Sequence, residues 1–108
     1  MEPDTIKKIR DELLKQYSGD DTLVDELLEV FRDEIPGLIR GIKDAIEARD
    51  AALLATHAHT CKSATGAVGL KEAMKIIALI EQAAKQGDIE NARSHYKQLE
   101  SELRIFLG

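Results

Sequence analysis

The stretch Asp20 to Ile46, DDTLVDELLEVFRDEIPGLIRGIKDAI, decides the fold. Its apolar residues recur every three or four positions, the spacing that lines one face of an amphipathic helix. They are Val24, Leu27, Leu28, Phe31, Ile35, Leu38, Ile42, Ala45 and Ile46. Pro36 removes a backbone hydrogen bond, yet the apolar spacing continues beyond it. We therefore predict one long helix, bent at Pro36, rather than two helices.

Three further amphipathic stretches follow this helix. The first begins after Asp50, a candidate N-cap, and stops near Val68-Gly69. The second lies between Leu70 and Gly87, and the third follows the candidate N-cap Asp88 and runs to Phe106. Each carries an apolar stripe, and the predicted core positions are Leu54, Ala58, Cys61, Thr65 and Val68; Leu70, Ala73, Ile77, Ile80 and Ala84; and Ile89, Ala92, Tyr96, Leu99, Leu103 and Phe106.

A shorter apolar face precedes the long helix. Ile6, Ile9 and Leu13 share one side of a helix that Asp4 could cap and that fades at Tyr17. Four long amphipathic helices joined by short loops bury their stripes by packing together. We predict an all-α fold: an antiparallel up-down four-helix bundle with a short accessory N-terminal helix.

The composition limits the possible functions. The 108 residues suit a single domain, 1–108, and 44% hydrophobic residues are enough for a core. A net charge of −5 argues against nucleic-acid binding, and the single cysteine excludes a disulfide framework. No apolar run is long enough to enter a membrane as a span, and no signal peptide opens the chain. We expect a soluble, cytoplasmic protein without membrane insertion.

The segment from Ala51 to Lys71 contains no Asp or Glu, although the protein is acidic. Off its predicted core stripe lie small residues around a histidine, with a lysine at the next turn: Ala55, His59, Lys62, Ser63 and Gly66. Such a face leaves an imidazole open to another macromolecule, and the lysine could hold an anion placed on it. The alternative is a solvated surface histidine beside small residues that serve helix packing.

Other chemistries fit the sequence less well. His57 and His59 are two positions apart, so they point in different directions on a helix and cannot share a metal ion. Cys61 lies on the core stripe, where a thiol is unreactive. Ser63 has no partners for a hydrolytic triad, and His95 is isolated on the last helix.

The stretch Ala58–Leu70, AHTCKSATGAVGL, resembles the signature of histidine-containing phosphotransfer (HPt) domains, approximately A-H-x-L-K-G-[SA]-[SA]-x-x-[LV]-G. Leu79-Ile80-Glu81-Gln82-Ala83, followed by Gly87-Asp88, is similar to the L-[LIM]-E-x-A segment of that family and its closing G-D. The pattern from Phe31 to Pro36 is also typical. The resemblance covers the chain from about Asp20 to Leu107, with departures at Ser63, where the family usually has Gly, and at Cys61, where it usually has Leu or Ile.

The resemblance implies a role for each matching position. His59 would be the phosphorylated residue, Lys62 would steady the phosphoryl oxygens, and Glu81 would hydrogen-bond the imidazole. A carboxylate in that position favours the tautomer that leaves the other ring nitrogen nucleophilic. Ala55, Ser63 and Gly66 would lie on the docking face, together with apolar side chains that the core does not need; the candidates are Leu53, Ile76 and Leu79.

The resemblance further implies a phosphocarrier rather than an enzyme. His59 would take a phosphoryl group from one response-regulator receiver domain and pass it to another, and a sensor or hybrid histidine kinase would be a further partner. The chain would need no cofactor of its own, because the receiver would hold the Mg²⁺. Three alternatives remain: a substrate domain phosphorylated directly by a chemotaxis-type kinase, a non-catalytic helical adaptor, and a degenerate domain that binds receivers without transfer.

Overall fold

A computed structural model describes residues 3–107, and every regular element in this range is a helix. There are six: α1 (Pro3–Gln16), α2 (Asp21–Glu47), α3 (Ala51–Ala67), α4 (Lys71–Lys85), α5 (Ile89–Glu102) and α6 (Arg104–Leu107). The prediction of an all-α fold is confirmed. The sequence predicted five helices, and the sixth arises because the last predicted helix is broken.

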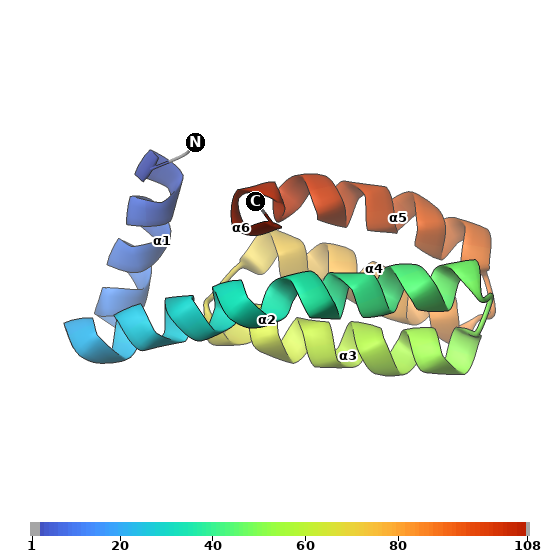
Figure 1. The fold of residues 1–108 in the computed structure, drawn as a ribbon, viewed down its shortest axis with the longest axis horizontal. Helices are drawn as coiled ribbons and strands as arrows, with labels where there is room; N and C mark the ends of the chain where they lie inside the picture. Colours follow the sequence, from blue (N-terminus) through green and yellow to red (C-terminus); the bar gives the residue numbers. More distant parts are fainter. Residues whose placement is uncertain (1–2, 108) are drawn as a thin grey trace.

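Helices α2 to α5 form the body of the molecule (Figure 1), which measures 42 × 25 × 19 Å. Helix α3 packs against both α2 and α4, and α4 also packs against α5, so the main contacts follow chain order. Helix α2 continues through Pro36 without interruption, which confirms one helix rather than two. No helix within residues 3–107 has the length and hydropathy of a membrane span.

The ends of the helices are fixed largely by aspartates. The carboxylates of Asp20, Asp50 and Asp88 accept hydrogen bonds from the backbone N–H three residues later, at 3.0 to 3.1 Å, as N-cap residues do. The predicted caps Asp50 and Asp88 are confirmed. Asp4 is not a cap, because α1 already begins at Pro3 and Asp4 lies in its first turn, where a carboxylate favours the helix dipole.

The core is built from one face of each helix, largely as the apolar spacing predicts. All the stripe positions predicted for α3, and those from Ile89 to Phe106, are buried. Leu27, Leu38 and Leu70 are only half-buried, whereas Ile39 is 5% exposed and belongs to the core. Along the 27-residue helix α2 the buried face turns slowly around the axis, so Ile39 takes the core position expected for Leu38. Leu70 lies before α4, as its N-cap residue.

The C-terminal segment departs from the predicted single helix. Helix α5 ends at Glu102 with Leu103 as its C-cap, and α6 begins one residue later. The break allows Phe106 to meet Phe31 of α2 edge to face, with ring centroids 5.0 Å apart and ring planes at 89°. This aromatic contact ties the end of the chain to the middle of α2.

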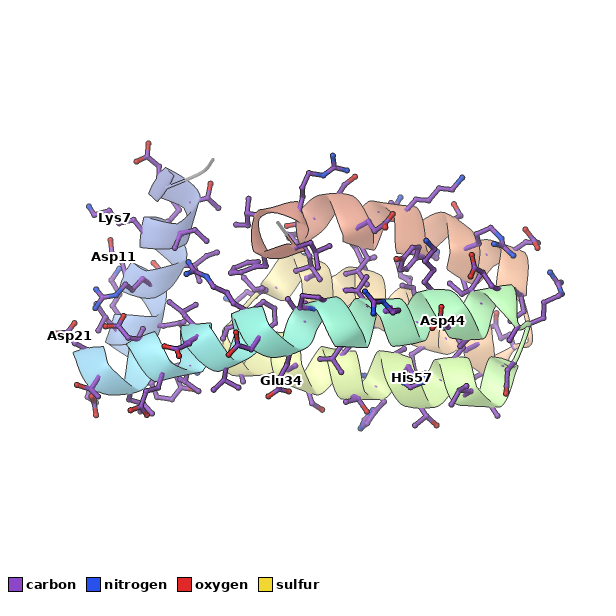
Figure 2. All side chains as sticks on the ribbon, in the orientation of Figure 1. Lys7, Asp11, Asp21, Glu34, Asp44 and His57 are labelled. Atoms are coloured by element: carbon purple, nitrogen blue, oxygen red, sulfur yellow. The ribbon has the colours of Figure 1, made fainter. Side chains whose placement is uncertain are left out.

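Helix α1 stands at a steep angle to α2 at one end of the molecule (Figure 1). The buried side chain of Leu13 anchors it, and Arg10 bonds to Asp25 at 2.8 Å and to Asp21 at 3.1 Å. Figure 2 shows Asp21 at the α1 end of α2, with Lys7 and Asp11 on α1 itself. Helix α1 therefore packs mainly against α2, while Leu13 and Gln16 also lie beside Gly69, between α3 and α4.

Candidate functional site

Helix α3 presents an uncovered face because its polar side chains are short and bond to their own backbone. The hydroxyl groups of Thr56, Thr60 and Ser63 each donate to the carbonyl oxygen four residues earlier, at 3.1 to 3.3 Å. Ser63 donates to the carbonyl of His59 itself. These hydroxyl groups stay close to the helix, so they do not cover the imidazole one turn away.

The His59 side chain is 65% exposed, and its Nδ1 lies 3.3 Å from Oε2 of Glu81 on α4. A carboxylate only accepts hydrogen bonds, so Nδ1 must carry a proton in this contact. In the neutral ring the other nitrogen, Nε2, then holds the free lone pair. The contact with Glu81 orients the ring and leaves the lone pair on Nε2, the nitrogen that does not face the carboxylate.

Lys62 reaches the same carboxylate from α3. Its Nζ donates to Oε1 of Glu81 at 2.7 Å, the shortest ion-pair contact of the site, and its side chain is 33% exposed. The sequence resemblance placed this lysine at a phosphoryl group. In the structure its ammonium bonds to the carboxylate of Glu81, which also contacts His59.

Glu81 itself is the buried charge of the site. It is 9% exposed, and the hydrogen bond from Lys62 is the main cause that lowers the pKa of its carboxyl below the ordinary value. Burial acts in the opposite direction, and the charges of Lys62 and Lys85 and the contact with His59 support the lowering. Glu81 is therefore ionised at neutral pH.

Lys85 is a member of this cluster that the sequence analysis missed. Its Nζ lies 3.6 Å from Oε2 of Glu81, the oxygen that also faces His59, and its side chain is 68% exposed. The spacing of Glu81 and Lys85, four residues apart on one helix, is the signal that would have found it.

The remaining candidates on this face divide into exposed and packed residues. Ser63, Leu53 and Leu79 are exposed, whereas Ala55 and Ile76 are half-buried and pack against the core. Gly66 makes room inside the chain: a Cβ there would lie 3.3 Å from the terminal methyl of Met74 on α4. The small residue at position 66 thus serves helix packing beside the site.

The other sequence candidates lie outside this cluster. Cys61 is fully buried, and burial raises the pKa of its thiol to about 12, so it stays protonated. His57 packs its ring against Gly41 of α2, and Figure 2 shows it on α3 where that helix runs alongside α2. His95 is half-buried, and its Nδ1 lies 3.4 Å from Oε1 of Gln98. Within residues 3–107 no group of three or more His, Cys, Asp or Glu side chains could hold a metal ion.

Comparison with known proteins adds one finding to this geometry. A family model described as "Hpt domain" matches residues 26–106, a range that includes α3, α4 and every residue of the cluster around Glu81. No curated protein and no solved structure gives a significant match to the chain.

Proposed function

Because this chain belongs to the Hpt domain family, we propose that it carries a phosphoryl group on His59 between the aspartates of response-regulator receiver domains. One observation carries the proposal: an exposed imidazole turns Nδ1 toward a buried, ionised carboxylate, which leaves Nε2 free to react. An incidental surface histidine has no need of a buried carboxylate behind it.

The geometry supports a simple transfer step. The lone pair of Nε2 forms a bond to the phosphorus of an aspartyl phosphate, the bond from phosphorus to the aspartate oxygen breaks, and the aspartate leaves as a carboxylate. Nδ1 keeps its proton throughout, so the phosphorylated ring is positively charged. Glu81 stabilises that charge at 3.3 Å, and Lys62 neutralises the phosphoryl oxygens. The same step in reverse returns the group to a second receiver.

The residues of the site indicate which part of the reaction this chain performs and which part the receiver domain performs. Lysines and a carboxylate supply charge and orientation, and we propose that the receiver supplies the Mg²⁺ needed for in-line transfer. The chain then acts as a phosphocarrier without autokinase activity and depends on a sensor or hybrid histidine kinase upstream. The cytoplasmic location expected from the sequence stays a prediction.

We assign this activity to one domain, 1–108, in which α2 to α5 form an up-down four-helix bundle and α1 is accessory. The docking face for the receiver surrounds His59 on α3 and α4. This face includes Ala55, Ser63 and Gly66, and its candidate apolar members are Leu53, Ile76 and Leu79. The exposure of Leu53 and Leu79, at 42% and 43%, supports their place in this face.

The test is incubation of the chain with a panel of phosphorylated receiver domains and Mg²⁺, with detection of acid-labile, alkali-stable phosphate. We expect label on the wild type and on His95→Gln, a histidine substitution on α5, and none on His59→Gln. Label on His59→Gln would overturn the assignment. Label from a kinase catalytic domain but from no receiver would favour the directly phosphorylated substrate domain. Unchanged partner binding and signalling output in His59→Gln would favour the adaptor.

A further inference from the structure

Glu81 orients His59, and it also has two lysine neighbours that this orientation does not require. Its Oε1 accepts a bond from Lys62, and its Oε2 lies near both Nδ1 of His59 and Nζ of Lys85. Because the carboxylate is nearly buried, loss of one of these partners leaves a poorly solvated charge, which is costly. A change at the site that removes one cation from Glu81 is therefore less costly if another cation replaces it.

The role proposed for Lys62 at the phosphoryl group requires this lysine to change position. Its ammonium bonds to the carboxylate that faces Nδ1, whereas the phosphoryl group would be bonded to Nε2, the ring nitrogen that does not face Glu81. A lysine that moves toward the phosphoryl oxygens withdraws the shortest bond that Glu81 accepts.

Lys85 is placed to compensate. Its Nζ is 3.6 Å from Oε2, longer than a hydrogen bond, and its side chain is mostly exposed, so a small rotation brings it into contact. Among the described residues, Lys85 forms an ion pair with Glu81 and with no other acidic side chain. Lys85 can thus strengthen its contact without breaking another.

We propose that Lys85 is a positioning residue: it takes the place of Lys62 on the Glu81 carboxylate when Lys62 moves to the phosphoryl group on His59. This exchange of cations keeps the buried carboxylate paired in both states, and it rests on the proposed phosphorylation of His59. Lys85 acts through Glu81 and does not touch the phosphoryl group.

The experiment loads the whole chain with phosphoramidate, so it requires no receiver. Nε2 of His59 forms the bond to phosphorus, the P–N bond of phosphoramidate breaks, and ammonia leaves with the electron pair. We expect Lys85→Met to load roughly three to five times more slowly than the wild type, the range that a partly exposed ion pair allows. Lys85→Arg should restore the rate. The matched control is Lys75→Met, which removes an exposed lysine of the same helix that pairs with Glu72.

Two further measurements separate an action through Glu81 from a general effect of charge. In a Glu81→Gln background, Lys85→Met should have no additional effect on loading, because the carboxylate that needs pairing is gone. In the wild type, NMR of the lysine side-chain Nζ groups should show both Lys62 and Lys85 shifting on phosphorylation, while Lys75 stays unchanged.

Several outcomes would overturn the inference: loading of Lys85→Met at the wild-type rate, an equal slowing in the Glu81→Gln background, an equal slowing by Lys75→Met, or no phosphate on His59 of the wild type. Failure of the proposed function gives a different result. In that case phosphoramidate loads His59 and the lysines exchange, yet no receiver delivers or accepts the group.

Discussion

At the scale of single residues, the candidate site is organised around the carboxylate of Glu81, which contacts His59, Lys62 and Lys85. Glu81 fixes the tautomer of His59 through Oε2 and holds Lys62 through Oε1. Hydrogen bonds that involve charged groups are stronger than neutral ones, so both neighbours are held in a defined geometry. The same carboxylate therefore orients the imidazole and pairs with the lysine.

The lysine leads to the first prediction. Lys62→Ala should slow phosphotransfer to and from His59 by roughly tenfold or more, because a charge-assisted bond to the phosphoryl oxygens contributes about 1.5 to 3 kcal/mol. The variant loses the stabilisation of the Lys62–Glu81 pair, but the fold should stay intact because the hydrophobic core is unchanged. Transfer rates and circular dichroism check the two parts. An unchanged transfer rate in Lys62→Ala would remove the role assigned to this lysine.

The lowered pKa of Glu81 predicts how stability depends on pH. The ionised carboxylate bonds to Lys62 only in the folded chain, so this pair stabilises the fold above the ordinary pKa of about 4.5. The stabilisation is lost as the pH falls through the lower pKa of the folded state, because protonation removes the charge.

The measurement is the free energy of unfolding in urea from pH 7 to pH 3 for chains with and without Glu81→Gln. Both chains carry His59→Gln, so that the imidazole does not contribute. We expect the chain with Glu81 to be the more stable near neutral pH and this advantage to disappear in acid. A difference that grows as the pH falls would contradict the assigned ion pair.

At the scale of secondary-structure elements, two glycines of α2 have different surroundings. A Cβ at Gly37 would meet no atom within 4 Å, whereas a Cβ at Gly41 would lie 3.1 to 3.3 Å from three ring atoms of His57. Glycine costs a helix interior roughly 0.5 to 1 kcal/mol relative to alanine. The glycine at 41 therefore allows the α3 histidine to pack closely against α2.

These surroundings predict opposite effects of the same substitution. Gly37→Ala should stabilise the chain by roughly 0.5 to 1 kcal/mol, because it gains helix propensity without a clash. Gly41→Ala should lose this gain or destabilise the chain, since the His57 ring must move. Urea denaturation compares the two variants directly. Equal stabilisation by both would show that the ring does not need the space.

The helices could be predicted from the sequence because each carries a periodic apolar stripe and a recognisable end. Asp50 and Asp88 cap the helices that follow them, and the stripe of α3 is buried as predicted. The break before α6 could not be predicted, because it is compensated by a contact between Phe106 and Phe31, far apart in the sequence.

The candidate site, like the helices, could be predicted in part from the sequence. The pattern around His59 predicted an exposed histidine with a lysine on the next turn, and the resemblance to HPt domains added Glu81. The bond between Lys62 and Glu81 depends on how α3 packs against α4, which spacing along one helix does not reveal. The same packing explains Gly66, whose neighbour is Met74 of α4.

At the scale of the whole molecule, the proposed site lies on α3 and α4, whereas helix α1 packs mainly against α2. The C-terminal residues Leu13 and Gln16 of α1 also lie beside Gly69, between α3 and α4. His59 and Glu81 lie within α3 and α4, away from this connection in the sequence. A change in the packing of α1 should therefore alter stability without altering the chemistry of the site.

Leu13→Ala tests this separation. Leu13 is 1% exposed, and truncation of a buried leucine costs about 2 to 5 kcal/mol, so we expect a lower free energy of unfolding. The rate of transfer to His59 should stay at the wild-type value while the variant is folded. Slower transfer in the folded variant would show that α1 contributes to the site.

The most direct test of a phosphate carrier is a chase experiment. The chain is loaded with labelled phosphate, purified and mixed with an unlabelled receiver domain and Mg²⁺, and the label on both proteins is followed over time. We predict that acid-labile label leaves the wild-type chain and appears on the receiver as alkali-labile aspartyl phosphate, with no transferable label from His59→Gln. Label that never reaches any receiver, or that reaches it equally from His59→Gln, would contradict the proposed role of His59.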